Sequence, residues 1–97
     1  GLSGIVDSNS QSAKYLTATD VSLMQEKVVS LLNDKNASKA IWQNTESGNR
    51  GNITKGKLIV QDNKTCHNLT FHNFFSQNKE TLKQLMCLDR EGLWKII

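Results

Sequence analysis

The stretch that decides the fold runs from Thr65 to Leu88 and reads TCHNLTFHNFFSQNKETLKQLMCL. Residues 65–75 and 81–88 carry apolar and β-branched side chains, and the polar residues 76–79 lie between them. Such runs on either side of a short polar turn are typical of a β-hairpin. The stretch therefore predicts two antiparallel strands that are adjacent in the sheet.

The two cysteines lie at opposite ends of this stretch. With Ser76-Gln77 as a two-residue loop, counting outward along both strands pairs Cys66 with Cys87. The alternation of the ladder makes this a non-hydrogen-bonded pair with Cα atoms about 4.5 Å apart, inside the disulfide range of about 4.4–6.8 Å. This register predicts a disulfide that closes a loop of roughly 22 residues and stabilises the fold by about 3 kcal/mol. Two buried free thiols are the alternative.

The same register divides the hairpin into two unequal faces. The more apolar face is predicted to hold His67, Leu69, Phe71, Asn73 and Phe75 with Leu82 and Met86 opposite them. Because successive side chains in a strand point to opposite faces, Cys66 and Cys87 fall on the more polar face.

A helix is predicted upstream of the hairpin. Thr17 can act as its N-cap, with Asp20 three residues later to complete a capping box. Apolar residues then recur at spacings of three and four on one stripe, namely Val21, Met24, Val28, Leu31 and Leu32. The polar residues Asn33, Asp34 and Asn36 end the pattern.

Three further strands are predicted at 40–42, 53–60 and 93–97, each bounded by turn residues. The order predicts an α+β fold with one N-terminal helix packed on a five-stranded antiparallel meander sheet with one disulfide. Residues 1–15 are mostly polar and are predicted to form a flexible leader or linker, and residues 16–97 the folded domain.

Composition excludes several classes of protein. The net charge is +3, and the 12 Lys and Arg residues are scattered without a basic run, so no nucleic-acid partner is expected. No apolar stretch approaches the ~20 residues of a membrane helix. The chain begins at Gly1 without Met, and we interpret it as a mature or trimmed fragment.

The residue types that could carry chemistry are badly placed for it. Adjacent strand residues point apart, so Cys66 and His67 cannot act as nucleophile and base. His67 and His72 face opposite ways, and Cys66 and His72 lie about 20 Å apart along the strand, which excludes a shared zinc ion. We expect no catalytic residues, no metal site and no cofactor. Phe71 and the two tryptophans, Trp42 and Trp94, are expected to be aromatic residues of the core.

Several short motifs occur in an order that resembles a known family. They are Trp42-Gln43-Asn44, Ser47-Gly48-Asn49-Arg50-Gly51, Thr65-Cys66-His67, Met86-Cys87 and Gly92-Leu93-Trp94-Lys95-Ile96. Together with Leu16 and Asp20, this arrangement is similar to the C-terminal domain of the bacterial outer-membrane surface antigens of the 17-kilodalton antigen family. Two departures stand out, since that family commonly has Arg where this chain has His67, and often Gly-Gly in place of Ser76-Gln77.

The resemblance implies a non-enzymatic domain of an outer-membrane lipoprotein with a structural or protein-interaction role. It implies a periplasmic or surface-exposed location, a protein partner in the cell envelope, and membrane attachment only through a lipid anchor that precedes Gly1. A periplasmic component of a bacterial secretion or conjugation system is an alternative. A small hydrolase or hydrolase inhibitor that acts on cell-wall material is another.

Overall fold

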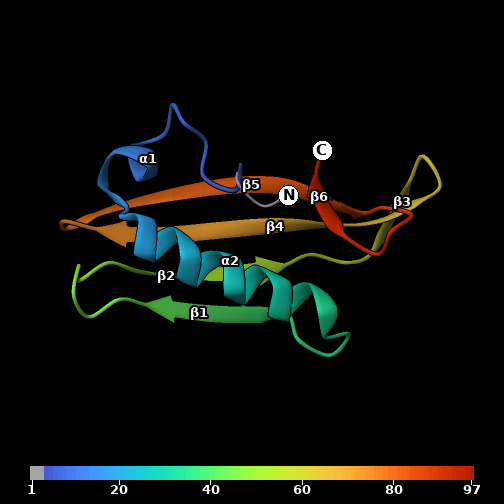
Figure 1. Cartoon of the computed structure of the whole chain (residues 1–97), viewed down its shortest axis with the longest axis horizontal. Helices are drawn as coiled ribbons and strands as arrows, with labels where there is room; N and C mark the ends of the chain where they lie inside the picture. Colours follow the sequence, from blue (N-terminus) through green and yellow to red (C-terminus); the bar gives the residue numbers. More distant parts are fainter. Residues whose placement is uncertain (1–3) are drawn as a thin grey trace.

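The protein is an antiparallel sheet with both helices on one of its faces (Figure 1). The computed structural model describes residues 4–97. The helices are α1 (Gln11–Tyr15) and α2 (Ala18–Asn33), and the strands are β1 (Lys39–Gln43), β2 (Arg50–Lys55), β3 (Ile59–Gln61), β4 (Lys64–Phe75), β5 (Asn78–Leu88) and β6 (Trp94–Ile96). The strand order β1-β2-β4-β5-β6, with β3 also paired to β4, confirms the α+β meander.

The β4–β5 hairpin has the predicted register throughout. Phe75 pairs with Asn78 across the two-residue turn, and Cys66 pairs with Cys87 at the far end. Ser76 and Gln77 have φ of 46° and 63°, the left-handed values that a tight hairpin turn requires, although neither is a glycine. The Cys66–Cys87 disulfide is present, with its Cα atoms 4.1 Å apart, slightly closer than expected.

The prediction of one continuous strand over residues 53–60 is wrong, because the structure divides this segment into β2 and β3. Lys55 pairs with Leu69 and Ile59 pairs with Cys66, so residues 56–58 lie opposite only two residues of β4. One extra residue makes a bulge, which breaks the ladder and reverses the faces beyond it. Lys55 therefore faces the helices, whereas Ile59 faces away from them.

The core lies between α2 and the sheet face that carries Leu69 and Phe71, which we call the inner face. The predicted capping box of α2 is confirmed, with Thr17 as N-cap and Asp20 as its partner. The buried side chains of the helix and the sheet form one cluster, with Met24, Val28, Leu31 and Leu32 from α2 and Trp42, Ile53, Leu69, Phe71 and Met86 from the sheet. Trp94 is only partly buried and packs against the edge of this cluster.

The flexible leader expected over residues 1–15 is wrong for the part that the structure describes, residues 4–15. Ile5 is completely buried in the core, and Ser10 caps α1 by accepting a hydrogen bond from the Ala13 N–H. Tyr15 stacks on Phe75 with ring centroids 5.2 Å apart. The contacts of Ile5 and Tyr15 reach residues that are distant in sequence, so the local polarity of the segment did not reveal them. Residues 1–3 lie outside the described residues.

Removing the disulfide by the double substitution Cys66→Ser and Cys87→Ser should lower the free energy of unfolding by about 3 kcal/mol, because the unfolded chain regains the entropy of an open loop. Urea unfolding followed by circular dichroism measures the change. The wild-type protein treated with reductant is the matched control and should unfold at the midpoint of the double variant. Equal midpoints for the oxidised and reduced wild type would contradict the expected stabilisation.

Candidate functional site: a basic groove beside Trp94

Asp20 is the centre of a buried hydrogen-bond network that joins α2 to the turn after β1. Its Oδ1 accepts from Asn44 Nδ2 at 2.8 Å and Ser47 Oγ at 2.7 Å, and its Oδ2 accepts from Asn49 Nδ2 at 2.7 Å. The backbone N–H of Thr17 also donates to Oδ2, at 2.8 Å. Burial alone would raise the pKa of Asp20, but these hydrogen bonds outweigh it and hold the pKa below its ordinary value.

This network explains most of the motif that follows Trp42. Asn44, Ser47 and Asn49 all turn their side chains toward the Asp20 carboxylate, and Gly48 adopts a φ of +77° between them. Sequence reasoning placed Asp20 in a capping box and missed its three side-chain donors. The only signal was the spacing of short polar residues after a strand, which is equally typical of an ordinary turn.

Gly51 completes the motif for a steric reason. A Cβ atom added at this position would lie 2.5 Å from Trp42 Nε1 and 2.6 Å from the carbonyl oxygen of His72. Trp42 and Asn73 flank Gly51 on neighbouring strands of the inner face. The absence of a side chain at Gly51 therefore leaves room for the Trp42 indole.

The carboxylate of Glu80 joins β5 to the start of α1. Glu80 accepts hydrogen bonds from the N–H groups of Gln11 and Ser12 and from Ser12 Oγ, at 2.6–3.0 Å, so β5 caps the start of α1. Burial by itself would raise the pKa of Glu80, but these hydrogen bonds lower it. Ser12 Oγ in turn accepts from Asn73 Nδ2 at 3.0 Å, which links α1 to β4.

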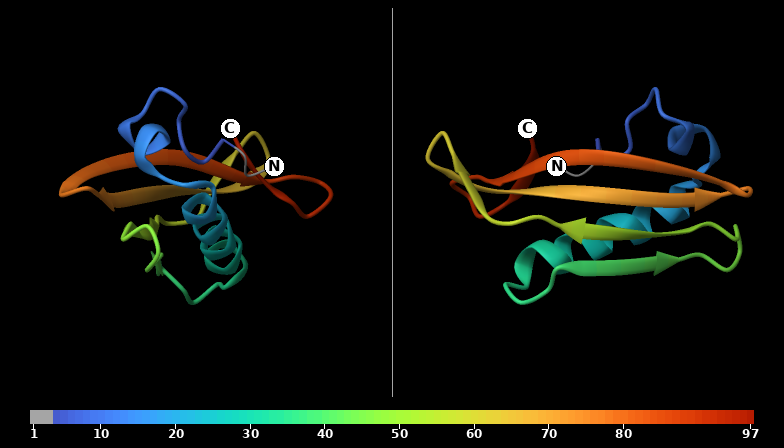
Figure 2. Two further views of the ribbon diagram at one scale, coloured as in Figure 1. Left: turned by 60° about the vertical axis from the view of Figure 1, so that its left-hand side comes forward. Right: turned by 180° about the vertical axis from the view of Figure 1, so that it is seen from behind.

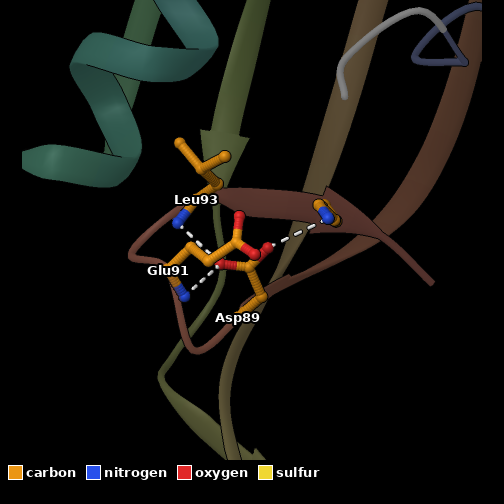
Figure 3. A network of polar contacts seen from close by, with 4 residues as sticks. Asp89, Glu91 and Leu93 are labelled. Atoms are coloured by element: carbon orange, nitrogen blue, oxygen red, sulfur yellow. Dashed lines mark hydrogen bonds and ion pairs between the residues drawn. The ribbon is translucent and has the colours of Figure 1, made fainter.

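Asp89 fixes the turn between β5 and β6 (Figure 3). Its Oδ1 accepts from the N–H groups of Glu91 and Leu93, both at 2.9 Å, and its Oδ2 lies 3.1 Å from Lys95 Nζ. The hydrogen bond from the Leu93 N–H is the main reason that the pKa of Asp89 is lowered. The contact of Lys95 with the Asp89 carboxylate raises the pKa of Lys95. This turn places Leu93 and Trp94 at the start of β6, beside the disulfide end of the sheet.

The histidines and cysteines are not brought together. His67 Nδ1 lies 2.8 Å from the Gly56 carbonyl oxygen, and His72 Nδ1 lies 3.0 Å from Thr81 Oγ1 on the opposite face. Both cysteines are in the disulfide. Within residues 4–97, no group of three or more His, Cys, Asp or Glu side chains could hold a metal ion.

An open groove of about 870 Å³ lies at the disulfide end of the sheet. It lies between the end of α2, the β2–β3 connection and the β5–β6 turn, and its lining includes Lys35, Lys55, Lys57, Leu58, His67 and Trp94. A smaller hollow of about 210 Å³ adjoins it and shares Leu32, Asn33, Gly92 and Trp94. We call the two together the Trp94 groove.

The Trp94 groove combines apolar walls with positive charge. Its lining includes Leu58 and Leu93, which are 59% and 56% exposed. Trp94 is held between His67, with ring centroids 5.8 Å apart, and Asn33, whose Oδ1 accepts from Trp94 Nε1 at 3.3 Å. None of the described residues that line the groove is acidic.

Lys55 has a structural role within this groove. Its Nζ donates to the carbonyl oxygens of Leu31 and Asp34 at 2.8 and 2.7 Å, where the last carbonyls of α2 have no partner in the helix. Lys35 and Lys57 are exposed on the rim. Lys95 also lines the smaller hollow, but Asp89 is paired with it. The positive charge without an acidic partner that faces a ligand therefore comes mainly from Lys35 and Lys57.

Comparison of the chain with protein-family models, with curated proteins and with solved structures finds no match. Neither helix of the described residues is long and apolar enough to span a membrane.

The substitution Gly51→Ala should lower the free energy of unfolding by about 1–3 kcal/mol, because the added methyl group displaces either Trp42 or the β4 backbone. Thermal and urea unfolding measure the loss. Gly4→Ala is the matched control, since a Cβ atom there would meet only Ile96 Cδ1 at 3.4 Å. A stability unchanged by Gly51→Ala would contradict the close packing of Trp42 on this strand.

The substitution Asp20→Asn should cost about 3 kcal/mol at neutral pH, because the amide group cannot accept from all of the buried donors around it. The exposed Glu26 of the same helix supplies the control, Glu26→Gln.

The loss of stability caused by Asp20→Asn should become smaller as the pH falls. Since folding lowers the pKa of Asp20, its stabilising contribution is fully present above the unfolded value of about 3.9 and is lost as the pH falls through the folded-state pKa. The difference in unfolding free energy between wild type and Asp20→Asn should therefore shrink below about pH 4. A difference that grew on acidification would contradict the lowered pKa.

Proposed function

We propose that this chain is a non-enzymatic binding domain of a bacterial outer-membrane lipoprotein, and that it contacts a protein partner of the cell envelope through the Trp94 groove. The observation that carries the proposal is the composition of this groove. It joins exposed leucines to a lysine rim and contains no acidic side chain among its described lining residues. Its complement is an apolar segment of a partner protein that also carries Asp or Glu.

The disulfide supports the envelope location. Structural disulfides persist in oxidising compartments such as the periplasm and are rare in reducing ones. Cys66 and Cys87 lie directly opposite each other and are buried, as expected for a structural bond. The bond joins the two strands whose ends carry His67 and the β5–β6 turn, so it also supports the wall of the groove.

The residues behind the resemblance to surface antigens support a binding role over a catalytic one. Asn44, Ser47 and Asn49 hold the Asp20 carboxylate, and Gly51 makes room for Trp42. These motif residues position the sheet and the helix and are turned away from solvent. A domain of this kind presents a rigid surface to another protein.

Site-specific photo-crosslinking in intact native cells tests the proposal. A photoreactive amino acid placed at Leu58 or Leu93 should give one common adduct, and mass spectrometry should identify the second protein in it as an envelope protein. The exposed Glu46, in the turn between β1 and β2, is the control position and should not give this adduct.

A variant with reversed charge at Lys35 and Lys57 adds a second test to the same experiment. Lys35→Glu with Lys57→Glu should reduce the yield of the common adduct at least tenfold, because the lysines would no longer attract the acidic segment. Adducts of equal yield from Glu46 and the groove positions, or an adduct that survives the charge reversal, would contradict a groove-specific partner.

A further inference from the structure

The sheet face that points away from the helices, which we call the outer face, collects half of the 12 Lys and Arg residues of the chain. The pairing register places their side chains there by strict alternation along each strand. They are Lys39 of β1, Arg50 of β2, Lys64 of β4, Lys79 and Lys83 of β5, and Lys95 of β6, and all are exposed.

Acidic side chains are missing from the described strand positions of this face. The outward positions of the described strands hold no Asp or Glu, because Glu80, the one strand carboxylate, points inward and caps α1. Asp89 reaches Lys95 from the adjoining turn and partly neutralises it. Among the residues described, no ion pair engages the other cations of the outer face.

The outer face is also open. Seen from behind, the strands lie in front of both helices of the described chain, and neither helix crosses them (Figure 2, right). The side chains between the cations are mostly short and polar, such as Asn52, Thr54, Asn68 and Thr70. Ile41 adds an apolar side chain that is 64% exposed at the sheet edge.

At the hairpin end, three outer-face residues form a cross-strand row. Phe74 pairs with Arg50 on one side and with Lys79 on the other. The guanidinium carbon of Arg50 lies 4.6 Å from the centroid of the Phe74 ring, so stacking holds the guanidinium in place. These residues line a hollow of about 290 Å³ that also contains Gly48 and the Ser76-Gln77 turn, without any acidic residue in its described lining.

We infer that the outer face binds the surface of a membrane that contains anionic phospholipids. The cations spread over five strands in two dimensions, which matches a plane of lipid phosphates better than a single linear polymer. Each Lys or Arg close to an anionic membrane strengthens binding about fivefold. The hollow beside Arg50 and Lys79 offers one phosphate a donor fork and an ammonium group.

A single-stranded nucleic acid fits the outer face less well. Proteins that bind single strands use several exposed aromatic rings as stacking platforms along a groove. Phe74 is the one Phe, Tyr or Trp on the outward strand positions of the described chain, and Arg50 already covers it. A basic face with so few aromatic rings therefore favours lipid phosphates over a single-stranded nucleic acid.

Co-sedimentation of the chain, without any lipid anchor, with large unilamellar vesicles tests this inference. The vesicles contain either phosphatidylcholine alone or phosphatidylcholine with a third of phosphatidylglycerol, at low and at physiological salt. The protein should bind only the anionic vesicles, and the binding should weaken strongly with salt. Equal binding to neutral vesicles would overturn the inference.

A matched pair of variants locates the surface. Lys39→Gln, Lys79→Gln and Lys83→Gln together should lower the partition coefficient by about a hundredfold, since each charge is worth about fivefold. Lys14→Gln, Lys27→Gln and Arg90→Gln together remove the same charge from exposed positions elsewhere and should lower it by less than fivefold. All these side chains are exposed, and the circular dichroism spectrum checks that both variants fold.

Two further results would overturn the inference. An equal loss of binding in both triple variants would show that binding depends on the net charge of the protein and not on the outer face. Tighter binding to a single-stranded oligonucleotide than to anionic vesicles at the same salt would assign the face to nucleic acid. Because the test uses neither a protein partner nor the Trp94 groove, its outcome is independent of the proposed function.

Discussion

The register of the β4–β5 hairpin is the constraint on which the rest of the structure depends. The two-residue turn at Ser76 and Gln77 decides which residues of the two strands lie opposite each other. A shift of one residue would move every side chain to the other face, since the side-chain period in a strand is two. It would take Phe71 out of the core and separate Cys66 from Cys87. The disulfide therefore stabilises one register as well as the fold.

Carboxylates act in this protein as connectors between elements that are distant in sequence. Asp20 joins α2 to the turn before β2, and Glu80 joins β5 to α1. Asp89 has a similar effect within the β5–β6 turn. Each accepts several hydrogen bonds, which favours its ionised form and lowers its pKa. Acid should therefore loosen several connections together.

The fold leaves two surfaces of different character. The Trp94 groove, at the disulfide end, is apolar with a basic rim. The outer face is mostly polar and basic, and it lies on the side of the sheet opposite α2 (Figure 2). The protein partner and the membrane surface that we propose would therefore bind to different parts of the domain. The small net charge of +3 conceals this division, because the acidic residues lie mainly in the helices and turns.

Local patterns in the sequence were enough to predict α2 with its cap, the hairpin register, the disulfide and the α+β order of elements. Their causes act over a few residues, through the periods of helix and strand and the geometry of a tight turn. The burial of Ile5, the donors around Asp20 and the bulge after Lys55 depend on which segments become neighbours in space. The cations of the outer face are far apart in sequence, and only the pairing of strands brings them onto one surface.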